Sequence, residues 1–288
     1  MIKLMADSTC DLSHEVLDLY NISLAPLTVK IEGNVFRDRV EIKPEEFYEM
    51  MDKLSEFPTT GAPSPTEYVD ILKDAVAEGH TEILCICMSS GTSASYQSAE
   101  LAKDYFFEEN PDSSVRIHIV DSKCMSHGSG WLLIKSALMR EQGASFEELV
   151  EFNETYKTKV KHFLSVDDLN HLIKSGRISN ASAMIGKFLL LKPIMTMKDG
   201  KGSVVAKERG RKKVLKHYVN EFKKRIDNDI TDFIIIGFTS DRTVAETLKE
   251  KVQAETEFAG EIHVLQMGVA VGTHVGLGAI SMFFVEKQ

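Results

Sequence analysis

The sequence lacks a long apolar run, and its four cysteines form no C-x-x-C pair. No stretch approaches the roughly 18 apolar residues that suggest a membrane span. The carboxylate of Asp7 also comes too early for the apolar core of a signal peptide. The cysteines show no zinc-finger spacing with histidine, so we expect reduced thiols and no metal site. Together these absences predict a cytoplasmic protein without a membrane segment.

Basic residues are outnumbered, and the usual nucleotide motifs are missing. The 34 lysines and arginines stand against 43 aspartates and glutamates, which gives a formal charge of −9. Such a chain has no general attraction to nucleic acid or to an anionic membrane surface. It contains no G-x-x-x-x-G-K-S/T loop, and the segment Gly128-x-Gly130 lacks the third glycine of a dinucleotide site. We therefore expect no nucleic-acid partner and no nucleotide cofactor.

Short runs rich in valine, isoleucine and leucine alternate with longer amphipathic segments along the 288 residues. This alternation is typical of strands and crossover helices in a largely parallel sheet, so the predicted fold class is α/β. The predicted strands are Ile2 to Ala6, Ser23 to Ile31, Glu82 to Met88, Val115 to Val120, Lys161 to Val166, Phe233 to Phe238 and Ile262 to Gln266. The predicted helices are Ser13 to Tyr20, Pro44 to Leu54, Ser64 to Glu78, Ser93 to Phe107, Gly130 to Glu141, Phe146 to Lys157, Gly210 to Arg225 and Arg242 to Lys251.

The length and the 43% hydrophobic content favour two domains. We place the boundary near residues 157 to 160, which gives one α/β domain of residues 1–158 and another of residues 159–288. Within the second domain, Asp199-Gly200 predicts a tight hairpin. Within the first, Ser64 and Glu67 flank a proline and predict a capped helix start.

Segments rich in small hydroxyl side chains and glycine sit at the ends of predicted strands, where α/β folds place their ligands. They are Asp7 to Thr9, Thr59 to Ser64, Ser89 to Tyr96, Asp121-Ser122, Gly176 to Ser179 and Gly272 to Gly278. A single segment of this kind commonly just caps a helix or forms a turn. Function is expected to depend on the set.

Taken in order, these segments resemble the DegV family, the fatty-acid-binding subunits of bacterial fatty acid kinase. The matching motifs are D-S-T-x-D-L at Asp7 to Leu12, T-S-x-P-S at Thr60 to Ser64 with Gly61 replacing serine, S-S-x-L-S-G-T-Y-Q-S-A at Ser89 to Ala99, G-R-I-S at Gly176 to Ser179, K-P-I at Lys192 to Ile194, and G-T-H-x-G-P-G at Gly272 to Gly278. The departures in the later motifs are Thr92, Ala94, Ser95 and Leu277.

The resemblance implies a two-domain DegV-like fold and a carrier without catalytic residues or cofactor. An acyl chain would lie in a buried tunnel, with its carboxylate near the domain junction. By this resemblance, Thr60, Ser93 and His274 would hold the carboxylate, and Thr273 would assist them. Arg177 would lie near the opening of the tunnel. Hydroxyl and imidazole groups can hold a carboxylate without burying a full ion pair.

The family also implies partners. They are an ATP-dependent fatty acid kinase subunit related to dihydroxyacetone kinases, which phosphorylates the bound carboxylate, and acyltransferases of phospholipid synthesis. Arg177 would help to dock the kinase or to steady the acyl phosphate. The departures at Ala94, Ser95 and Leu277 leave the preferred chain length and unsaturation open, and the segment from Gly176 to Ile185 is a candidate for admitting the lipid.

Less specific interpretations of the same residues stay open. His274 can tie down a loop, Ser93 can cap a helix, and Arg177 can be a surface charge. The basic cluster Lys207, Arg209, Arg211, Lys212 and Lys213 suits either an acidic partner or a solvated connection between elements.

Two other functions compete with the carrier. In a serine-dependent acyl hydrolase or transferase, Ser93 would attack, His274 would act as base and Asp121 would orient it. The segment Gly91 to Ser95 approaches G-x-S-x-G but has serine in place of the second glycine. A scaffold protein is the other competitor, and it would fill its core with side chains.

Overall fold

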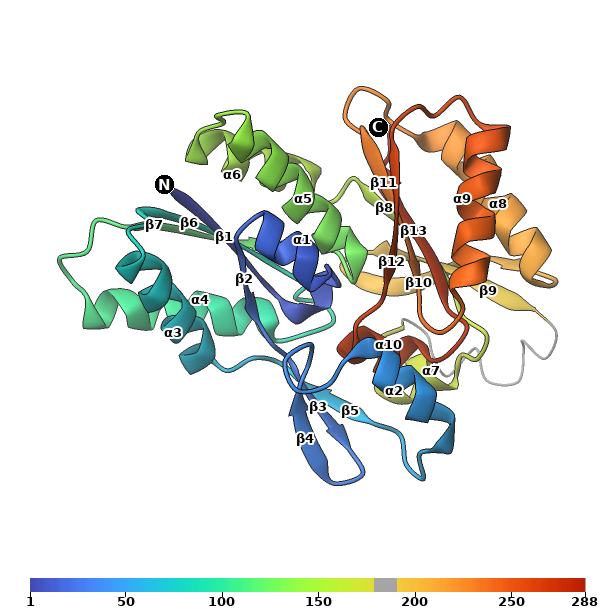
Figure 1. Ribbon diagram of the computed structural model, residues 1–288, viewed down its shortest axis with the longest axis horizontal. Coiled ribbons are helices and arrows are strands. Elements are labelled where there is room, and N and C mark those ends of the chain that lie inside the picture. The colour runs from blue at the N-terminus through green and yellow to red at the C-terminus, as the bar shows by residue number, and fades with distance from the viewer. Residues whose placement is uncertain (179–190, 288) are drawn as a thin grey trace.

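The computed structural model describes residues 1–178 and 191–287. Its first sheet has the order β2-β1-β6-β7, and all of its strand pairs are parallel. The strands are β1 (Ile2–Asp7), β2 (Ile22–Ala25), β6 (Glu82–Cys87) and β7 (Arg116–Asp121). Helices α3 (Pro65–Ala77) and α4 (Ser95–Glu109) cover one face, and α1 (His14–Leu19), α5 (His127–Glu141) and α6 (Phe146–Tyr156) cover the other (Figure 1).

The second sheet has the order β10-β9-β8-β13-β11-β12. Its strands are β8 (Val160–Ser165), β9 (Lys192–Lys198), β10 (Lys201–Glu208), β11 (Phe233–Phe238), β12 (Glu261–Gln266) and β13 (Ile280–Val285). Among its described strands, β11 and β12 pair in parallel and the other pairs are antiparallel, so the largely parallel pairing predicted from the alternation is found in the first sheet. The hairpin β9-β10 and the strand β13, which was not predicted, bring in the antiparallel pairs. Helices α8 (Arg211–Arg225) and α9 (Arg242–Glu255) cover one face.

A third, small sheet joins the two. It has the order β4-β3-β5, with β3 (Thr28–Ile31), β4 (Asn34–Arg37) and β5 (Thr59–Gly61). The predicted strand from Ser23 to Ile31 is therefore two strands, because Pro26 falls between β2 and β3 and proline has no N–H for a ladder. Helix α2 (Pro44–Met50), the 3₁₀ turn η2 (Met51–Lys53) and helix α10 (Val269–Val275) pack against this sheet.

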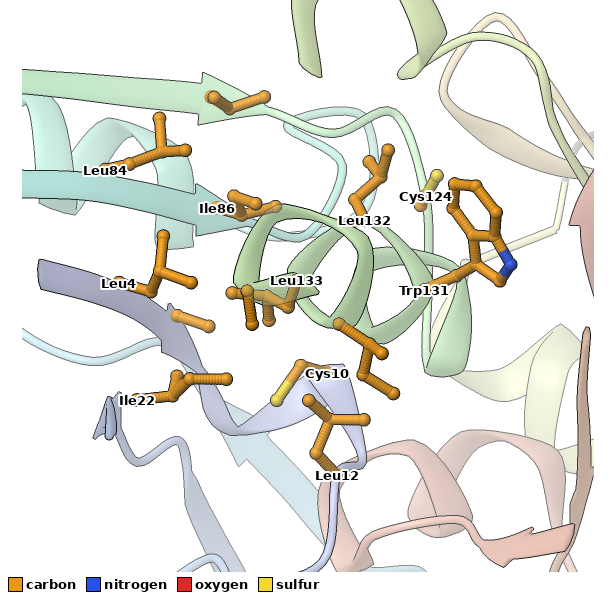
Figure 2. Close-up of a cluster of buried hydrophobic side chains, with 14 of the residues drawn as sticks. Leu4, Cys10, Leu12, Ile22, Leu84, Ile86, Cys124, Trp131, Leu132 and Leu133 are labelled. Atoms are coloured by element: carbon orange, nitrogen blue, oxygen red, sulfur yellow. The ribbon is translucent and has the colours of Figure 1, made fainter. Parts of the chain in front are cut away.

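Helix α5 lies between the two large sheets and belongs to a core that both share. It contacts β1 and β6 of the first sheet and β8, β11 and β13 of the second. Figure 2 shows leucines of this helix facing Leu4 and Leu84 while Trp131 points away from them. The indole N–H of Trp131 donates to the carbonyl of Phe233 at 3.0 Å, and the two rings stack. The division at residues 158 and 159 remains a proposal, since this core crosses it.

Two local predictions from turn chemistry are confirmed. Ser64 and Glu67 form a capping box at the start of α3. Asp199 and Gly200 connect β9 to β10 with φ angles of 51° and 74°, as the hairpin requires. Among the described residues, no helix has both the length and the apolar character needed to cross a membrane.

Candidate functional site

A cavity of about 180 Å³ lies where the first sheet, the small sheet and α10 meet. Thr9, in the 3₁₀ turn η1 (Ser8–Cys10) after β1, and Met88, which follows β6, contribute to its wall. Because β1 and β6 are parallel neighbours, both strands deliver these residues to the same edge. We call this space the head-group cavity. Thr60, Ser93, Arg177 and His274 line it together, although they come from four separate motifs.

Thr60 on β5 and His274 on α10 form the central pair of the head-group cavity. Thr60 Oγ1 and His274 Nε2 lie 2.8 Å apart and share a hydrogen bond, in which the imidazole tautomer decides the donor. The other ring nitrogen, Nδ1, is buried and has no hydrogen-bond partner in the part of the chain that the structure describes. A buried polar nitrogen without a partner is costly, so a ligand acceptor or donor at this place would stabilise the site.

Electrostatics keep the imidazole neutral at physiological pH. Burial lowers the pKa of His274 to about 3, and the positive charge of Arg177 acts in the same direction. A negative charge beside the ring would act in the opposite direction, because an opposite charge favours the protonated imidazole.

Ser93 sits in the loop between β6 and α4. Its Oγ accepts a hydrogen bond from the backbone N–H of Ser95, the first residue of α4, at 3.1 Å, while Ala94 holds the N-cap position. That bond uses an oxygen lone pair and leaves the hydroxyl proton free to donate. The bond to Ser95 and ligand binding are thus compatible at Ser93.

The remaining predicted site residues take different positions. Thr273 is buried, does not line the head-group cavity, and donates its hydroxyl to the carbonyl of Val269 within α10 at 2.9 Å. Arg177 follows helix α7 (Asn170–Ser175), lines the cavity, and donates to the carbonyl of Ser175 at 2.6 Å. Ser179 and the rest of the suggested opening segment to Ile185 lie outside the described residues.

A second cavity of about 30 Å³ adjoins the first, and its walls are almost entirely apolar. Leu164, Met195, Met267 and Phe283 are among its lining residues, so it reaches between the second sheet and α10. We call it the tail cavity. The two cavities share three lining residues, Met125, Arg177 and Val271. The head-group cavity, whose walls mix polar and apolar side chains, therefore adjoins a cavity whose walls are almost entirely apolar.

The departures from the family motifs keep the local structure intact. The Ser95 hydroxyl bonds to buried Asp7 at 2.5 Å and to Tyr68 at 2.7 Å, so a hydroxyl is retained where the motif has threonine. Ala94 has a φ of −82°, which any residue adopts, so glycine is not needed there. Leu277 is half-buried against the cluster of the small sheet and α10.

The arrangement required for a serine hydrolase does not assemble. His274 pairs with Thr60, and its Nδ1 has no carboxylate to orient it. Asp121 instead accepts hydrogen bonds from Ser90 and Lys123. The triad logic needs nucleophile, base and orienting acid in one chain of hydrogen bonds, and that chain is missing among the described residues.

Sequence reasoning missed a buried charged cluster behind α10. Asp11 Oδ1 accepts from the Gly268 N–H at 2.8 Å, and Asp38 Oδ1 accepts from the Val269 N–H at 3.2 Å. The Arg39 guanidinium lies 3.6 Å from Asp11. Burial raises the pKa of Asp11 to about 7 despite that positive charge, and burial also raises the pKa of Asp38. Only Asp11 carried a signal, as part of D-S-T-x-D-L.

Cys124 and His127, which lie close together in the sequence, each bond to a backbone carbonyl. Cys124 donates its thiol to the carbonyl of Lys157, and His127 bonds to the carbonyl of Asp11. In residues 1–178 and 191–287, no group of three or more histidine, cysteine, aspartate or glutamate side chains is placed to hold a metal ion. Within the basic cluster, Arg211 pairs with Asp167 at 2.6 Å.

Comparison with known proteins gives one consistent family. The family model that matches residues 1–287 carries the description "uncharacterised protein, DegV family". A DegV domain-containing protein of Clostridium acetobutylicum is 33% identical over 288 residues, which cover 99% of each chain. A DegV domain-containing protein of Caldanaerobacter subterraneus is 32% identical over 289 residues, with the same coverage.

Solved structures agree with the model in fold. A DegV family protein from Thermus thermophilus, described as binding fatty acid, is 28% identical with a TM-score of 0.88 over 99% of both chains. A stearic acid-binding protein from Eubacterium ventriosum is 28% identical with a TM-score of 0.88, over 100% of this chain and 99% of that one. The fatty acid-binding DegV of Bacillus subtilis is 26% identical with a TM-score of 0.86, over 99% of both. These matches confirm the predicted resemblance and its fold.

Proposed function

The chain belongs to the DegV family, and on this premise we propose that it is a carrier that buries a long-chain fatty acid and presents the carboxylate. One observation carries the proposal: a cavity lined by the polar side chains of Thr60, Ser93 and His274 adjoins, at shared lining residues, a cavity with apolar walls. A scaffold with a filled core would have no need of such a pair. A fatty acid fits this arrangement, because its carboxylate suits the head-group cavity and its alkyl chain suits the tail cavity.

In the proposed complex, the carboxylate lies among Thr60, Ser93 and His274. Among the described residues, the Ser93 hydroxyl proton has no acceptor and His274 Nδ1 has no partner; with the tautomer in which Nε2 accepts from Thr60, Nδ1–H can donate to the carboxylate. Hydrogen bonds to a charged acceptor contribute more than bonds between neutral groups. Thr60 fixes the ring through its bond to Nε2.

The acyl chain supplies most of the affinity in this proposal. Burial contributes about 0.8 kcal/mol per CH₂, so a sixteen-carbon chain gives on the order of 12 kcal/mol before the entropy cost of binding. The tail cavity must widen from about 30 Å³ to receive it. Met195 and Met267 in its walls are suited to this change, because unbranched methionine side chains adapt to irregular spaces.

The carboxylate is then available to a partner. We propose, as the family resemblance implies, that a separate ATP-dependent kinase phosphorylates it and that acyltransferases of phospholipid synthesis use the acyl phosphate. This chain would work in the cytoplasm and contribute no catalytic base. Arg177 lines the head-group cavity, which suits a role in docking the kinase or in steadying the acyl phosphate.

Calorimetric titration of delipidated protein with palmitate tests the carboxylate assignment. Removing one donor to a partly buried carboxylate costs about 1 to 3 kcal/mol, so Ser93→Ala and His274→Ala are each expected to weaken binding roughly five-fold or more. His118→Ala serves as the control. His118 is a half-buried residue of β7 that bonds to Glu154 of α6, and the variant is expected to bind palmitate like the wild type. Unchanged affinity in both cavity variants would refute the assignment.

A further inference from the structure

Among the described residues, Met125, Arg177 and Val271 line both the head-group cavity and the tail cavity. An acyl chain that occupies both cavities would pass beside these residues. We call these three residues the partition. Met125 belongs to the loop between β7 and α5, whereas Val271 belongs to α10. The width of the passage therefore depends on how this loop and this helix are held relative to each other.

The loop wall is held in an unusual backbone conformation. Ser126, directly after Met125, has φ 54° and ψ −142°, and Lys123 has φ 56°. Residues other than glycine rarely adopt such backbone angles, and a conformation of this kind persists only where surrounding contacts fix it. The Met125 N–H donates to His162 Nε2 at 3.3 Å, and the Cys124 carbonyl accepts from the Ser89 N–H at 2.8 Å.

Asp11 adds a contact that connects the two walls. Its Oδ2 accepts from the Ser126 hydroxyl at 2.6 Å, and its Oδ1 accepts from the Gly268 N–H at 2.8 Å. Gly268 is the N-cap of α10, the helix that carries Val271. One carboxyl group thus bonds to the residue beside Met125 and to the start of the helix that carries Val271.

The surroundings allow little movement of this carboxyl group. Asp11 is 1% exposed, and the buried Arg39 guanidinium lies 3.6 Å away. A Cβ atom at position 268 would come within 2.6 Å of Asp11 Oδ1, so glycine permits the close approach. Asp38 bonds to the Val269 N–H and to Ser8, but no bond connects it to Ser126. Asp11 therefore differs from its acidic neighbour in reaching both walls.

We propose that Asp11 is a positioning residue that fixes the separation of Met125 and Val271 and thereby determines which acyl-chain shapes the passage accepts. The proposal rests on the proposed fatty-acid binding. Loosening either wall would let straight and cis-kinked chains pass with less discrimination. The head group would still find Thr60, Ser93 and His274 in place.

The test measures Kd for palmitate and for oleate with delipidated full-length protein. The readout is the ratio of the two constants, because general destabilisation lowers both affinities without changing their ratio. Ser126→Ala removes one of the two bonds and leaves Asp11 in place. Asp11→Ala removes both. We expect the ratio to move toward one by about five-fold in Ser126→Ala, the factor that corresponds to one lost hydrogen bond, and by at least as much in Asp11→Ala, which loses two.

Two controls separate positioning from folding. Asp11→Asn can keep both contacts, because the amide oxygen accepts from Gly268 and the amide N–H donates to Ser126, so its ratio should equal that of the wild type. Ser8→Ala removes its bond to Asp38 and the bond that it accepts from the Leu27 N–H, but neither bond of Asp11, so it should also preserve the ratio.

A wild type that binds both fatty acids with equal Kd, or a Ser126→Ala protein with the wild-type ratio, would overturn the inference. The proposed function would survive either result. A wild type that binds neither fatty acid would instead contradict the proposed function.

Discussion

Thr60 and Thr273 show why a residue's type does not settle its role. Both carry a hydroxyl near His274, and both were predicted to face the carboxylate. The Thr60 hydroxyl pairs with the imidazole in the head-group cavity, whereas the Thr273 hydroxyl donates to Val269 within its own helix. Of these two threonines, only Thr60 lines the head-group cavity.

Replacement by valine, which has a similar shape and no hydroxyl, tests this difference. Thr60→Val should weaken palmitate binding by roughly five-fold or more, because His274 loses the partner that fixes its ring. Thr273→Val should leave the affinity within about two-fold, since its hydroxyl satisfies a helix carbonyl that already has other partners. Fluorescence competition against a lipid probe measures both. Equal losses in the two variants would contradict the placement.

The motifs predicted residues that line the head-group cavity, but they did not predict the buried contacts that hold the neighbouring elements in place. Thr60, Ser93, Arg177 and His274 gather in one cavity, while their roles toward a carboxylate remain a proposal. The bond between Asp11 and Gly268 joins positions 257 apart in the chain. No local sequence pattern predicts such a contact, because it depends on how elements that are far apart in the sequence pack together.

At the scale of elements, long periodic segments were predictable and short ones were not. The strands β1, β6, β7, β8, β11 and β12 and the longer helices lie close to their predicted positions. The short elements β4, β5, α7 and α10, with three to seven residues each, were missed. Such segments have too few residues to show a period, and tertiary packing decides their structure.

The β9-β10 turn, correctly predicted from Asp199-Gly200, also packs against the loop after β6. The Ser89 hydroxyl donates to the Gly200 carbonyl at 2.7 Å, and a Cβ atom at Gly200 would come within 2.7 Å of that hydroxyl oxygen. Gly200→Ala should therefore lower the free energy of unfolding by about 2 kcal/mol or more, from the positive φ and from the clash.

Gly143→Ala is the matched control for that substitution. Gly143 has φ +90° with nothing near the added atom, so only the backbone cost of about 1 kcal/mol is expected. Urea unfolding of the two variants compares them. If Gly143→Ala destabilises the protein as much as Gly200→Ala, then the contact between the turn and Ser89 contributes nothing.

At the scale of the whole molecule, the site depends on contacts between the two large sheets. Helix α5 packs against both (Figure 1). The Asp11 cluster connects the end of the first sheet to α10. The cluster places acidic groups in a dry environment, which disfavours their charged forms. Global stability should therefore respond to pH through these residues.

Asp11 gives this response a definite sign. Its pKa is about 7 in the folded protein against 3.8 as its ordinary value, so the folded state keeps a proton that the unfolded state loses. Between about pH 4 and 7, rising pH then lowers the free energy of unfolding, by about 1.4 kcal/mol per unit of pKa difference. Asp7 and Asp38 act in the same direction, while His127, His162 and His274, with lowered pKa values, oppose them.

Comparison with Asp11→Asn isolates the contribution of Asp11, because the other groups are common to both proteins. The stability of the wild type relative to the variant should fall as pH rises from 4 to 7 and stay level above that range. Urea unfolding across this range measures it. A difference that rises with pH would mean that Asp11 is ionised in the folded protein and stabilised by Arg39.

Mass spectrometry of an organic extract tests the central claim most directly. Full-length protein purified from bacteria is denatured, extracted, and compared with a blank preparation and with His274→Ala. The account predicts about one long-chain fatty acid per wild-type chain and less in the variant. A wild-type extract without fatty acid, together with no uptake from a panel of saturated and unsaturated acids, would contradict it.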